Sequence, residues 1–312
     1  MVGGGSKRLL WSISESPSPR ERRWGEGAPV RYTTLTVIAS CSPLFLGEGL
    51  GVRGGEMTQA ERRPVALVTG GSRGIGAATA VALAARGYDV VLTYRNKASR
   101  AERVAERIRA LGADALTIGG DMTRADDLAR LLAEVAGWRG ALDALILNAS
   151  GGLEREALAA DPNYPMRINR DAQIALVEGA LPLLRSGGSI TLVTSHWAVL
   201  YGRAPQLPAY EEVARSKHAG EQALRARMPE LAARGLRLAI VTGDVIEGTI
   251  TPRLLERATP GLAERRRASM GDLPTAEQMG EAIAQAATDG ALPNGSLIVV
   301  GGPLEAMLAD DA

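Results

Sequence analysis

The chain has 312 residues, enough for one large domain or two ordinary ones, and 46% of them are apolar, which is ample for a globular core. Its formal net charge of +1 provides no global attraction to nucleic acid or to acidic membranes. One cysteine, Cys41, and two histidines, His196 and His218, exclude an internal disulfide and a metal site rich in thiolate or imidazole ligands. No apolar run reaches the roughly 18 residues that a membrane-spanning helix requires.

The N-terminal region differs in composition from the rest of the chain. Residues 1–56 mix Gly, Ser, Pro and Arg in irregular order, without sustained helical or strand periodicity. The apolar run TTLTVIASCSPLFLG is too broken, and too far inside the chain, for a signal peptide. We predict a disordered extension here, consistent with a misassigned start upstream of Met57. A targeting or partner-binding tail is the alternative.

From Arg63 onward, short β-branched runs alternate with longer Ala-, Leu- and Arg-rich segments of helical period. Continuous apolar strands separated by amphipathic helices are typical of a parallel sheet covered on both faces. We therefore predict one α/β domain over residues 57–312, a doubly wound Rossmann sheet of about seven strands in three α/β/α layers. The expected strands are PVALVTG, DVVLTY, DALTIGG, DALILNAS, SITLVTS, LRLAIVTG and SLIVVGG.

A glycine-rich loop, TGGSRGIG, follows the first expected strand and opens a helix. Gly70 permits a sharp turn, Gly74 lets backbone N–H groups approach a pyrophosphate, and Gly76 lets the helix pack on the strand. The helix N-terminus adds the positive end of its dipole. This strand–loop–helix context predicts a dinucleotide site, with a purely structural turn as the alternative. The other expected cofactor contacts in the loop are Ser72, Arg73 and Ile75.

The segment after the second strand, LTYRNK, indicates which dinucleotide is bound. NAD sites usually place a carboxylate here to hold the adenosine ribose, and this segment has none. Arg95 lies there instead, and Arg73 projects from the glycine-rich loop. Because arginine grips phosphate with two parallel hydrogen bonds, the pair favours the 2′-phosphate of NADP(H) over NAD(H). The alternative is that both arginines are simply solvated.

Three motifs together resemble the short-chain dehydrogenase/reductase family: TGGSRGIG, GGDMT and LNASGG. The likeness covers about residues 63–302. It implies that Asp121 and Met122 border the adenine and that Asn148 and Ala149 lie beside the cofactor. It also implies a catalytic asparagine at Asn169, a catalytic serine at Ser195, and a backbone contact to the nicotinamide carboxamide near Val245, in VTGDVIEGTIT.

The catalytic tyrosine of the family is displaced in this chain. The usual position, four residues before Lys217, holds Val213, which has no proton to donate, whereas Tyr210 lies seven residues before the lysine. On an ideal helix both spacings leave the pair on roughly one face, but seven residues span about 10.5 Å. The predicted roles are Tyr210 as the acid, with Lys217 holding the cofactor ribose and lowering the pKa of the phenol.

This Tyr-x6-Lys spacing resembles the NADPH-dependent enoyl-acyl carrier protein reductases. In enoyl reduction, negative charge develops on the thioester oxygen, several bonds from the carbon that receives hydride. An acid moved away from the nicotinamide is consistent with that chemistry. The resemblance further implies that Ser195 binds the substrate carbonyl and that Asn169 supports a water-linked proton path.

Two further segments are candidates for substrate contact. The loop after Ser195 is longer than is usual in the family, and it contains His196, Trp197 and Tyr201. These could line a pocket or simply pack, and Tyr201 is an alternative acid. Residues 247–280 are expected to form a lid, and the Arg265–Arg267 cluster there could meet an acyl-carrier phosphate or lie on a solvated helix face.

The resulting hypothesis is an NADP(H)-dependent oxidoreductase that transfers hydride to an enoyl or keto substrate, possibly an acyl thioester. Two alternatives stay open: a ketoreductase or alcohol dehydrogenase, and a non-catalytic NADP(H)-binding sensor or partner subunit, which Val213 favours. We expect a cytoplasmic homo-oligomer, dimer or tetramer, with a small-molecule or acyl-thioester substrate, and no metal, nucleic acid or membrane partner.

Overall fold

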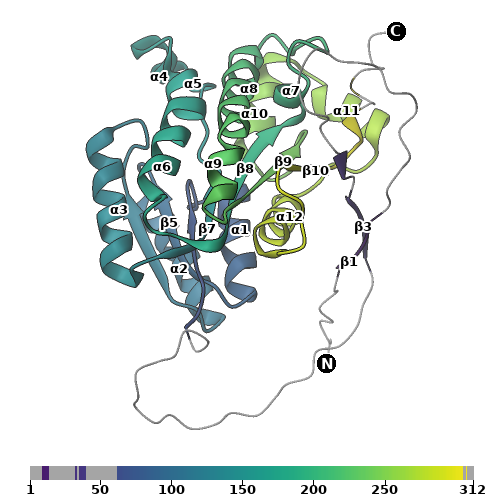
Figure 1. The fold of residues 1–312 in the computed structure, drawn as a ribbon. Coiled ribbons are helices and arrows are strands. Elements are labelled where there is room, and N and C mark those ends of the chain that lie inside the picture. Colours follow the sequence, from purple (N-terminus) through teal and green to yellow (C-terminus); the bar gives the residue numbers. More distant parts are fainter. Residues whose placement is uncertain (1–8, 14–31, 34, 40–61, 305–306, 308–312) are drawn as a thin grey trace, which may run out of the picture.

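The computed structural model describes residues 9–13, 32–33, 35–39, 62–304 and 307. Its centre is a parallel sheet in the order β6-β5-β4-β7-β8-β9-β10, which confirms the seven predicted strands (Figure 1). A two-residue strand, β2 (Tyr32–Thr33), pairs with the β10 edge. The main strands are β4 (Val65–Val68), β5 (Asp89–Tyr94), β6 (Ala115–Gly119), β7 (Leu142–Leu147), β8 (Leu184–Ser195), β9 (Arg237–Gly243) and β10 (Ser296–Val300).

Helices cover both faces of the sheet and give the predicted three layers (Figure 1). One apolar core lies beneath α1 (Gly74–Ala85), α2 (Ala98–Ala110) and α12 (Ala276–Thr288). The other lies beneath α3 (Ala125–Arg139), α6 (Ala172–Ala180), α8 (Glu211–Ala226) and α9 (Met228–Ala233). Because side chains alternate between the two faces of a strand, strands buried on both sides read as continuous apolar runs.

The remaining helices are short and lie around the carboxyl ends of the strands or in the segment that follows β9. They are α4 (Arg155–Ala160), α5 (Tyr164–Met166), α7 (His196–Val199), α10 (Ile250–Ala258), α11 (Leu262–Met270) and a π-helical turn, η1 (Arg167–Asp171). Among the helices that the structure describes, none combines the length and apolarity needed to cross a bilayer.

Only three pieces of the N-terminal region are described. β1 (Leu9–Ile13) pairs antiparallel with β3 (Leu35–Ala39), and β2 lies against β10. These strands were not anticipated, since the sequence there lacks a sustained strand pattern. The rest of residues 1–56 lies outside the described residues, so the predicted disordered extension stays a prediction.

The chain order of the strands decides where a ligand site can form. β4 lies between β5 and β7, so successive connections run in opposite directions from the middle of the sheet. In open α/β sheets, ligands bind in the crevice that this reversal leaves at the carboxyl ends of the strands. Most of the predicted site residues lie at or just after the carboxyl ends of β4, β5, β6, β7, β8 and β9, and they therefore meet at one edge.

Candidate active site

A cleft of about 660 Å³ opens at the carboxyl edge of the sheet. It brings together most of the residues predicted from sequence. Two lie apart from its lining: Asn169 borders a small adjoining cavity, and Val245 is buried between cleft-lining neighbours. The predicted residues that line the cleft are Gly70, Ser72, Arg73, Gly74, Ile75, Gly76, Arg95, Asp121, Met122, Asn148, Ala149, Ser195, Tyr210 and Lys217.

The glycine-rich loop has the geometry of a phosphate cradle. No side chain caps the start of α1, and its first turn carries no acidic residue, so the N-terminal backbone N–H groups are left for an anion. Gly74 has φ of +52°, a conformation that favours glycine. At Gly76, an added Cβ would lie 2.3 Å from the Gly70 carbonyl oxygen. The loop therefore needs these glycines and fits a pyrophosphate.

Asn148 fixes this loop to the centre of the sheet. Its Nδ2 donates to the carbonyl oxygens of Thr69 (2.8 Å) and Gly70 (3.3 Å), which directly follow the neighbouring strand β4. In return, the Thr69 hydroxyl accepts from the backbone N–H groups of Asn148 and Ala149, each at 2.9 Å. The asparagine thus holds the glycine-rich loop in place, a positioning role at the strand end.

The adenosine end of the cleft is cationic. Arg73 and Arg95 are exposed and line the cleft, and Arg95 Nη1 donates to the Tyr164 hydroxyl at 2.7 Å. Sequence analysis missed Lys97 and Arg100, which are also exposed and line the same end. The signal was present, because the run RNKASR directly follows β5. Four cations and no carboxylate at the end of β5 suit a phosphorylated ribose.

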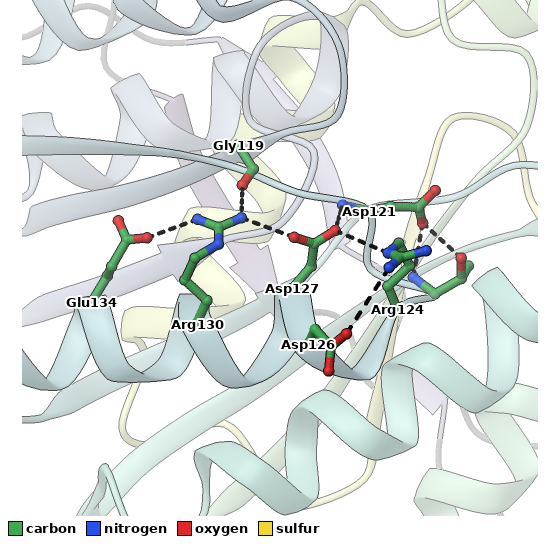
Figure 2. Close-up of polar contacts among 8 residues, drawn as sticks. Gly119, Asp121, Arg124, Asp126, Asp127, Arg130 and Glu134 are labelled. Atoms are coloured by element: carbon green, nitrogen blue, oxygen red, sulfur yellow. Dashed lines mark hydrogen bonds and ion pairs between the residues drawn. The ribbon is translucent and has the colours of Figure 1, made fainter.

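The loop between β6 and α3, which carries Asp121 and Met122, is held by a network of charged side chains (Figure 2). The Asp121 carboxylate accepts from the backbone and hydroxyl of Thr123, at 2.9 and 2.7 Å. Asp127 accepts from the Asp121 backbone N–H at 3.0 Å, and Arg130 bridges Asp127 and Glu134 (Figure 2). The Asp121 N–H, followed by Arg130, lowers the pKa of Asp127. The network shapes the wall of the cleft at this end.

At the opposite end, Ser195 and Tyr210 meet. Ser195 ends β8, and Tyr210 is the residue immediately before α8, with both side chains almost fully buried. Burial raises the pKa of Tyr210 to about 12; the charge of Asp244 also raises it, and a side-chain hydrogen bond with Ser195 lowers it. Lys217 is not among the groups that shift this pKa, so the predicted lowering by the lysine is absent from this structure.

The relation of Tyr210 to α8 differs slightly from the ideal helix assumed from the sequence. The Tyr210 carbonyl accepts the first helical bond, from the Ala214 N–H at 2.9 Å, but the residue itself lies outside the helix. Val213, at the usual tyrosine position, is buried in the core beneath α8. Its apolar side chain packs there, and Tyr210, one turn earlier, is the phenol that lines the cleft together with Ser195.

Lys217 and Asn169 share the small cavity behind the cleft. Burial lowers the pKa of Lys217 to about 8, so the ammonium is still mostly charged at pH 7. Asn169 lies in the π-helical turn η1, and its Nδ2 donates to the Gly151 carbonyl (2.9 Å) and the Ser216 hydroxyl (3.0 Å). These bonds fix the asparagine side chain beside the lysine.

On the substrate side, the structure favours one of the two alternatives left open for the loop after Ser195, namely packing. His196 and Trp197 are buried and do not line the cleft, and Tyr201 does not line it either. His196 is held between the Thr242 hydroxyl and the Gly302 carbonyl, each at 3.1 Å, and burial lowers its pKa to about 4, so it is neutral. Trp197 belongs to the hydrophobic core, and Tyr201 packs against that core.

The arginine cluster of the lid is likewise not an open cationic surface. Arg266 is buried and pairs with Asp244, while Arg267 pairs with Glu247. Arg265 donates to the Pro260 carbonyl at 3.1 Å. Of the two alternatives for this cluster, the exposure of Arg265 and Arg267 agrees with a solvated helix face, whereas Arg266 fits neither because it is buried. Within the described residues, no group of His, Cys, Asp and Glu side chains could hold a metal ion.

The fold and cleft define a dinucleotide-binding domain with a serine–tyrosine–lysine set at its inner end. The family model for short chain dehydrogenases matches residues 64–258, more than half of the chain. The chain belongs to the short-chain dehydrogenase/reductase family.

Comparison with curated relatives gives two strong likenesses to reductases. Versicolorin reductase 1 of Aspergillus parasiticus is 39% identical over 141 residues, covering 44% of this chain and 54% of the relative. The chain thus spans about half the length of that relative. Hydroxynaphthalene reductase arp2 of Aspergillus fumigatus is 30% identical over 224 residues, covering 70% of this chain and 79% of the relative. A 1-cyclohexenylcarbonyl-CoA reductase of Streptomyces collinus is 29% identical, covering 60% and 66%.

Solved structures agree on the fold. A short chain dehydrogenase from Burkholderia cenocepacia, in complex with NADP, superposes with a TM-score of 0.67 at 31% identity, covering 78% of this chain and 98% of that one. A 3-oxoacyl-[acyl-carrier protein] reductase from Brucella melitensis, in complex with NAD, gives a TM-score of 0.67 at 27% identity, covering 78% and 97%. Both neighbours carry a nicotinamide cofactor on this fold.

Proposed function

We propose that the chain is an NADP(H)-dependent reductase that acts on a ketone, with Tyr210 as the proton donor. The observation that carries this proposal is the convergence of Ser195 and Tyr210 at the inner end of the cleft. Two hydroxyl groups at the same end of one cleft can both reach one substrate oxygen, which is where negative charge develops during carbonyl reduction. The versicolorin and hydroxynaphthalene reductases are reductases by name, which supports a reduction as the reaction of this chain.

The residues that line the cleft fit NADP(H). The uncapped start of α1 and its glycines would hold the pyrophosphate, and the cationic end of the cleft would hold the 2′-phosphate. Lys217 would hold the ribose hydroxyls near the nicotinamide. NADPH, when bound, supplies the hydride; the protein orients and stabilises the reacting groups. The NADP-bound neighbour supports this preference, although the other neighbour carries NAD.

The residues of this chain would then perform the polar half of the reaction. Ser195 donates a hydrogen bond to the substrate carbonyl oxygen and polarises it. As the carbonyl carbon gains hydride, the electron pair of the C=O π bond moves to oxygen, and that oxygen takes the phenolic proton of Tyr210. A raised phenol pKa keeps Tyr210 protonated, and therefore ready to donate, at neutral pH.

Enoyl reduction is the second candidate, because Tyr210 lies one helical turn before the usual position of the acid. The 1-cyclohexenylcarbonyl-CoA reductase among the relatives is an enoyl thioester enzyme by its name. In that reaction the same serine and tyrosine would stabilise and protonate an enolate oxygen. The non-catalytic alternative is less well supported, because a sensor would not require this polar cluster.

The test uses the full chain, NADPH and two thioesters of matched acyl length, one 3-keto and one 2-enoyl, together with a bicyclic aromatic ketone. Oxidation of NADPH with either ketone supports the proposal. Oxidation with the enoyl thioester alone supports the second candidate. Tight NADPH binding without turnover of any of them contradicts both.

A cytoplasmic homo-oligomer remains part of the proposal and is supported by the family resemblance alone. Light scattering on the purified chain would test the oligomeric part. A monomer at the concentrations used for activity would contradict it.

A further inference from the structure

Three features that set this chain apart in sequence are in contact in the structure. The long segment after Ser195 contributes Trp197, the shifted acid is Tyr210, and the lid contributes Arg266 from α11. The Trp197 and Tyr210 ring centroids lie 5.4 Å apart at 54°. The Arg266 guanidinium lies over the Trp197 ring, 5.2 Å from its centroid.

Arg266 is an unusual anchor for a lid helix. Its neighbours Glu264, Arg265 and Arg267 are exposed, whereas Arg266 and Leu262, one turn apart, are buried. An apolar residue would anchor the helix without the desolvation cost of a guanidinium. That cost is offset here by Asp244, whose Oδ2 lies 3.3 Å from Arg266 Nε, and by the cation–π contact with Trp197.

Asp244 ties this arrangement to the reacting end of the cleft. It follows β9, lines the cleft, and has a fully buried carboxylate that acts on the Tyr210 phenol. Asp244 is the charged group that acts on the phenol; it pairs with Arg266 on α11, and Lys217 lies farther along α8. Arg266 therefore contacts both groups that act on Tyr210. These are the Trp197 ring, which packs against the tyrosine ring, and the Asp244 carboxylate, which raises the pKa of the phenol.

We propose that Arg266 is a positioning residue that couples packing of the lid helix α11 to the orientation of the catalytic acid, through Trp197 and Asp244. The proposal rests on the function proposed above for Tyr210. With α11 packed, the guanidinium compensates the Asp244 charge and supports the Trp197 ring. With α11 displaced, the acid loses that support, so a site with an open lid is poorly set for proton transfer.

The test compares Arg266→Gln with Arg267→Gln, the same change at the adjacent exposed position. Arg266→Lys serves as the conservative variant, since it keeps the charge beside Asp244 and loses the planar stacking. We expect Arg266→Gln to lower kcat about 10- to 100-fold, as misplacement of a reacting group does, while the NADPH Kd and substrate KM stay within about twofold. Arg266→Lys should recover part of the loss, and Arg267→Gln should match the wild type.

Hydrogen–deuterium exchange on the same proteins provides a readout that needs no turnover. Arg266→Gln should speed exchange in the segments around Trp197 and Tyr210, and Arg267→Gln should not. Wild-type kcat in Arg266→Gln, or faster exchange confined to α11, would overturn the proposal. If the wild type reduces no substrate, the proposed function fails, and the exchange pattern still decides whether Arg266 supports the Tyr210 segment. If Arg266→Gln does not fold, both measurements are made on Arg266→Lys instead. Wild-type kcat together with wild-type exchange in Arg266→Lys would then overturn the proposed coupling through the stacked ring.

Discussion

Ser195 and Tyr210 lie 15 positions apart in the sequence, and both line the inner end of the cleft, where the Ser195 side chain lowers the pKa of the Tyr210 phenol. We expect this relationship to let the shifted tyrosine act as the acid. Because Ser195 ends β8 while Tyr210 immediately precedes α8, a rigid strand end and a helix start set their separation. The pair therefore does not depend on the four-residue spacing used in most of the family.

Removing the serine should weaken catalysis more than binding. We expect Ser195→Ala to lower kcat about 100-fold, the usual cost of losing one donor to a developing oxyanion, with little change in the NADPH Kd. Steady-state kinetics and cofactor titration measure the two effects. Ser186→Ala, at the exposed opposite end of β8, is the matched control and should leave kcat unchanged. Equal losses in both variants would contradict a role for Ser195 in the reaction.

The cationic end of the cleft should determine cofactor preference. Arg95→Ala should weaken NADPH binding about tenfold or more, the cost of one charge-assisted contact, while leaving NADH binding nearly unchanged. Arg109→Ala, on the exposed surface of α2 where the side chain pairs with Glu102, is the control. Fluorescence titration with the two cofactors measures the ratio. A parallel loss of NADH affinity would indicate that Arg95 does not read the 2′-phosphate.

Lys217 should introduce a pH limit on the alkaline side. Burial lowers its pKa to about 8, so the free protein holds a charged ammonium below that pH and loses the charge as pH rises through it. We expect NADPH affinity to decline above about pH 8 in the wild type. In Lys217→Met, affinity should be weaker and should lack this decline. A wild-type affinity that is flat from pH 7 to pH 10 would contradict the role of the ammonium.

The lowered pKa of Lys217 also makes folding stability depend on pH. The unfolded chain keeps Lys217 protonated up to about pH 10.4, the ordinary value, whereas the folded chain releases the proton near pH 8. Between these values the unfolded state binds more protons, so this group contributes stability that rises with pH across the window. Denaturation of Lys217→Met and the wild type at pH 7.5 and pH 10 should show the mutant's relative advantage shrinking at the higher pH.

The glycine-rich loop offers a stability test with a built-in control. At Gly76, a methyl group would collide with the Gly70 carbonyl, so Gly76→Ala should destabilise the fold by about 1–3 kcal/mol and abolish NADPH binding. At Gly137, in exposed α3, nothing lies within 4 Å of an added Cβ. Gly137→Ala should therefore stabilise the fold by about 0.5–1 kcal/mol. Denaturant unfolding measures both, and equal effects would contradict the cradle geometry.

Much of the fold was predictable because both faces of the sheet are covered. That burial makes strands such as β4 and β9 continuous apolar runs, and the glycine-rich loop between β4 and α1 marks the edge where ligands bind. The cleft residues follow from that topology. The sequence also named Ser195 and Tyr210 as separate site residues, and both line the cleft at the ends of predictable elements.

What the sequence could not predict depends on side-chain burial. Arg266 looks like its exposed neighbours in ERRRAS, and only the packing of α11 against the segment after β9 distinguishes it. His196 and Trp197 look like pocket residues after Ser195, but the turn of α7 directs them into the core. Burial is likewise the largest influence on the pKa of Tyr210, and it raises that pKa. The sequence suggested the opposite, a pKa lowered by Lys217.

The most direct test of Tyr210 as the acid compares kcat for NADPH oxidation in the wild type, Tyr210→Phe and Tyr201→Phe, with the best substrate from the matched panel. Tyr201 is the alternative acid on the same loop, and its ring packs near His218, 5.8 Å between centroids. We predict that Tyr210→Phe loses about 100- to 10,000-fold in kcat with unchanged NADPH affinity, and that Tyr201→Phe stays near the wild type. Wild-type turnover in Tyr210→Phe would contradict the account.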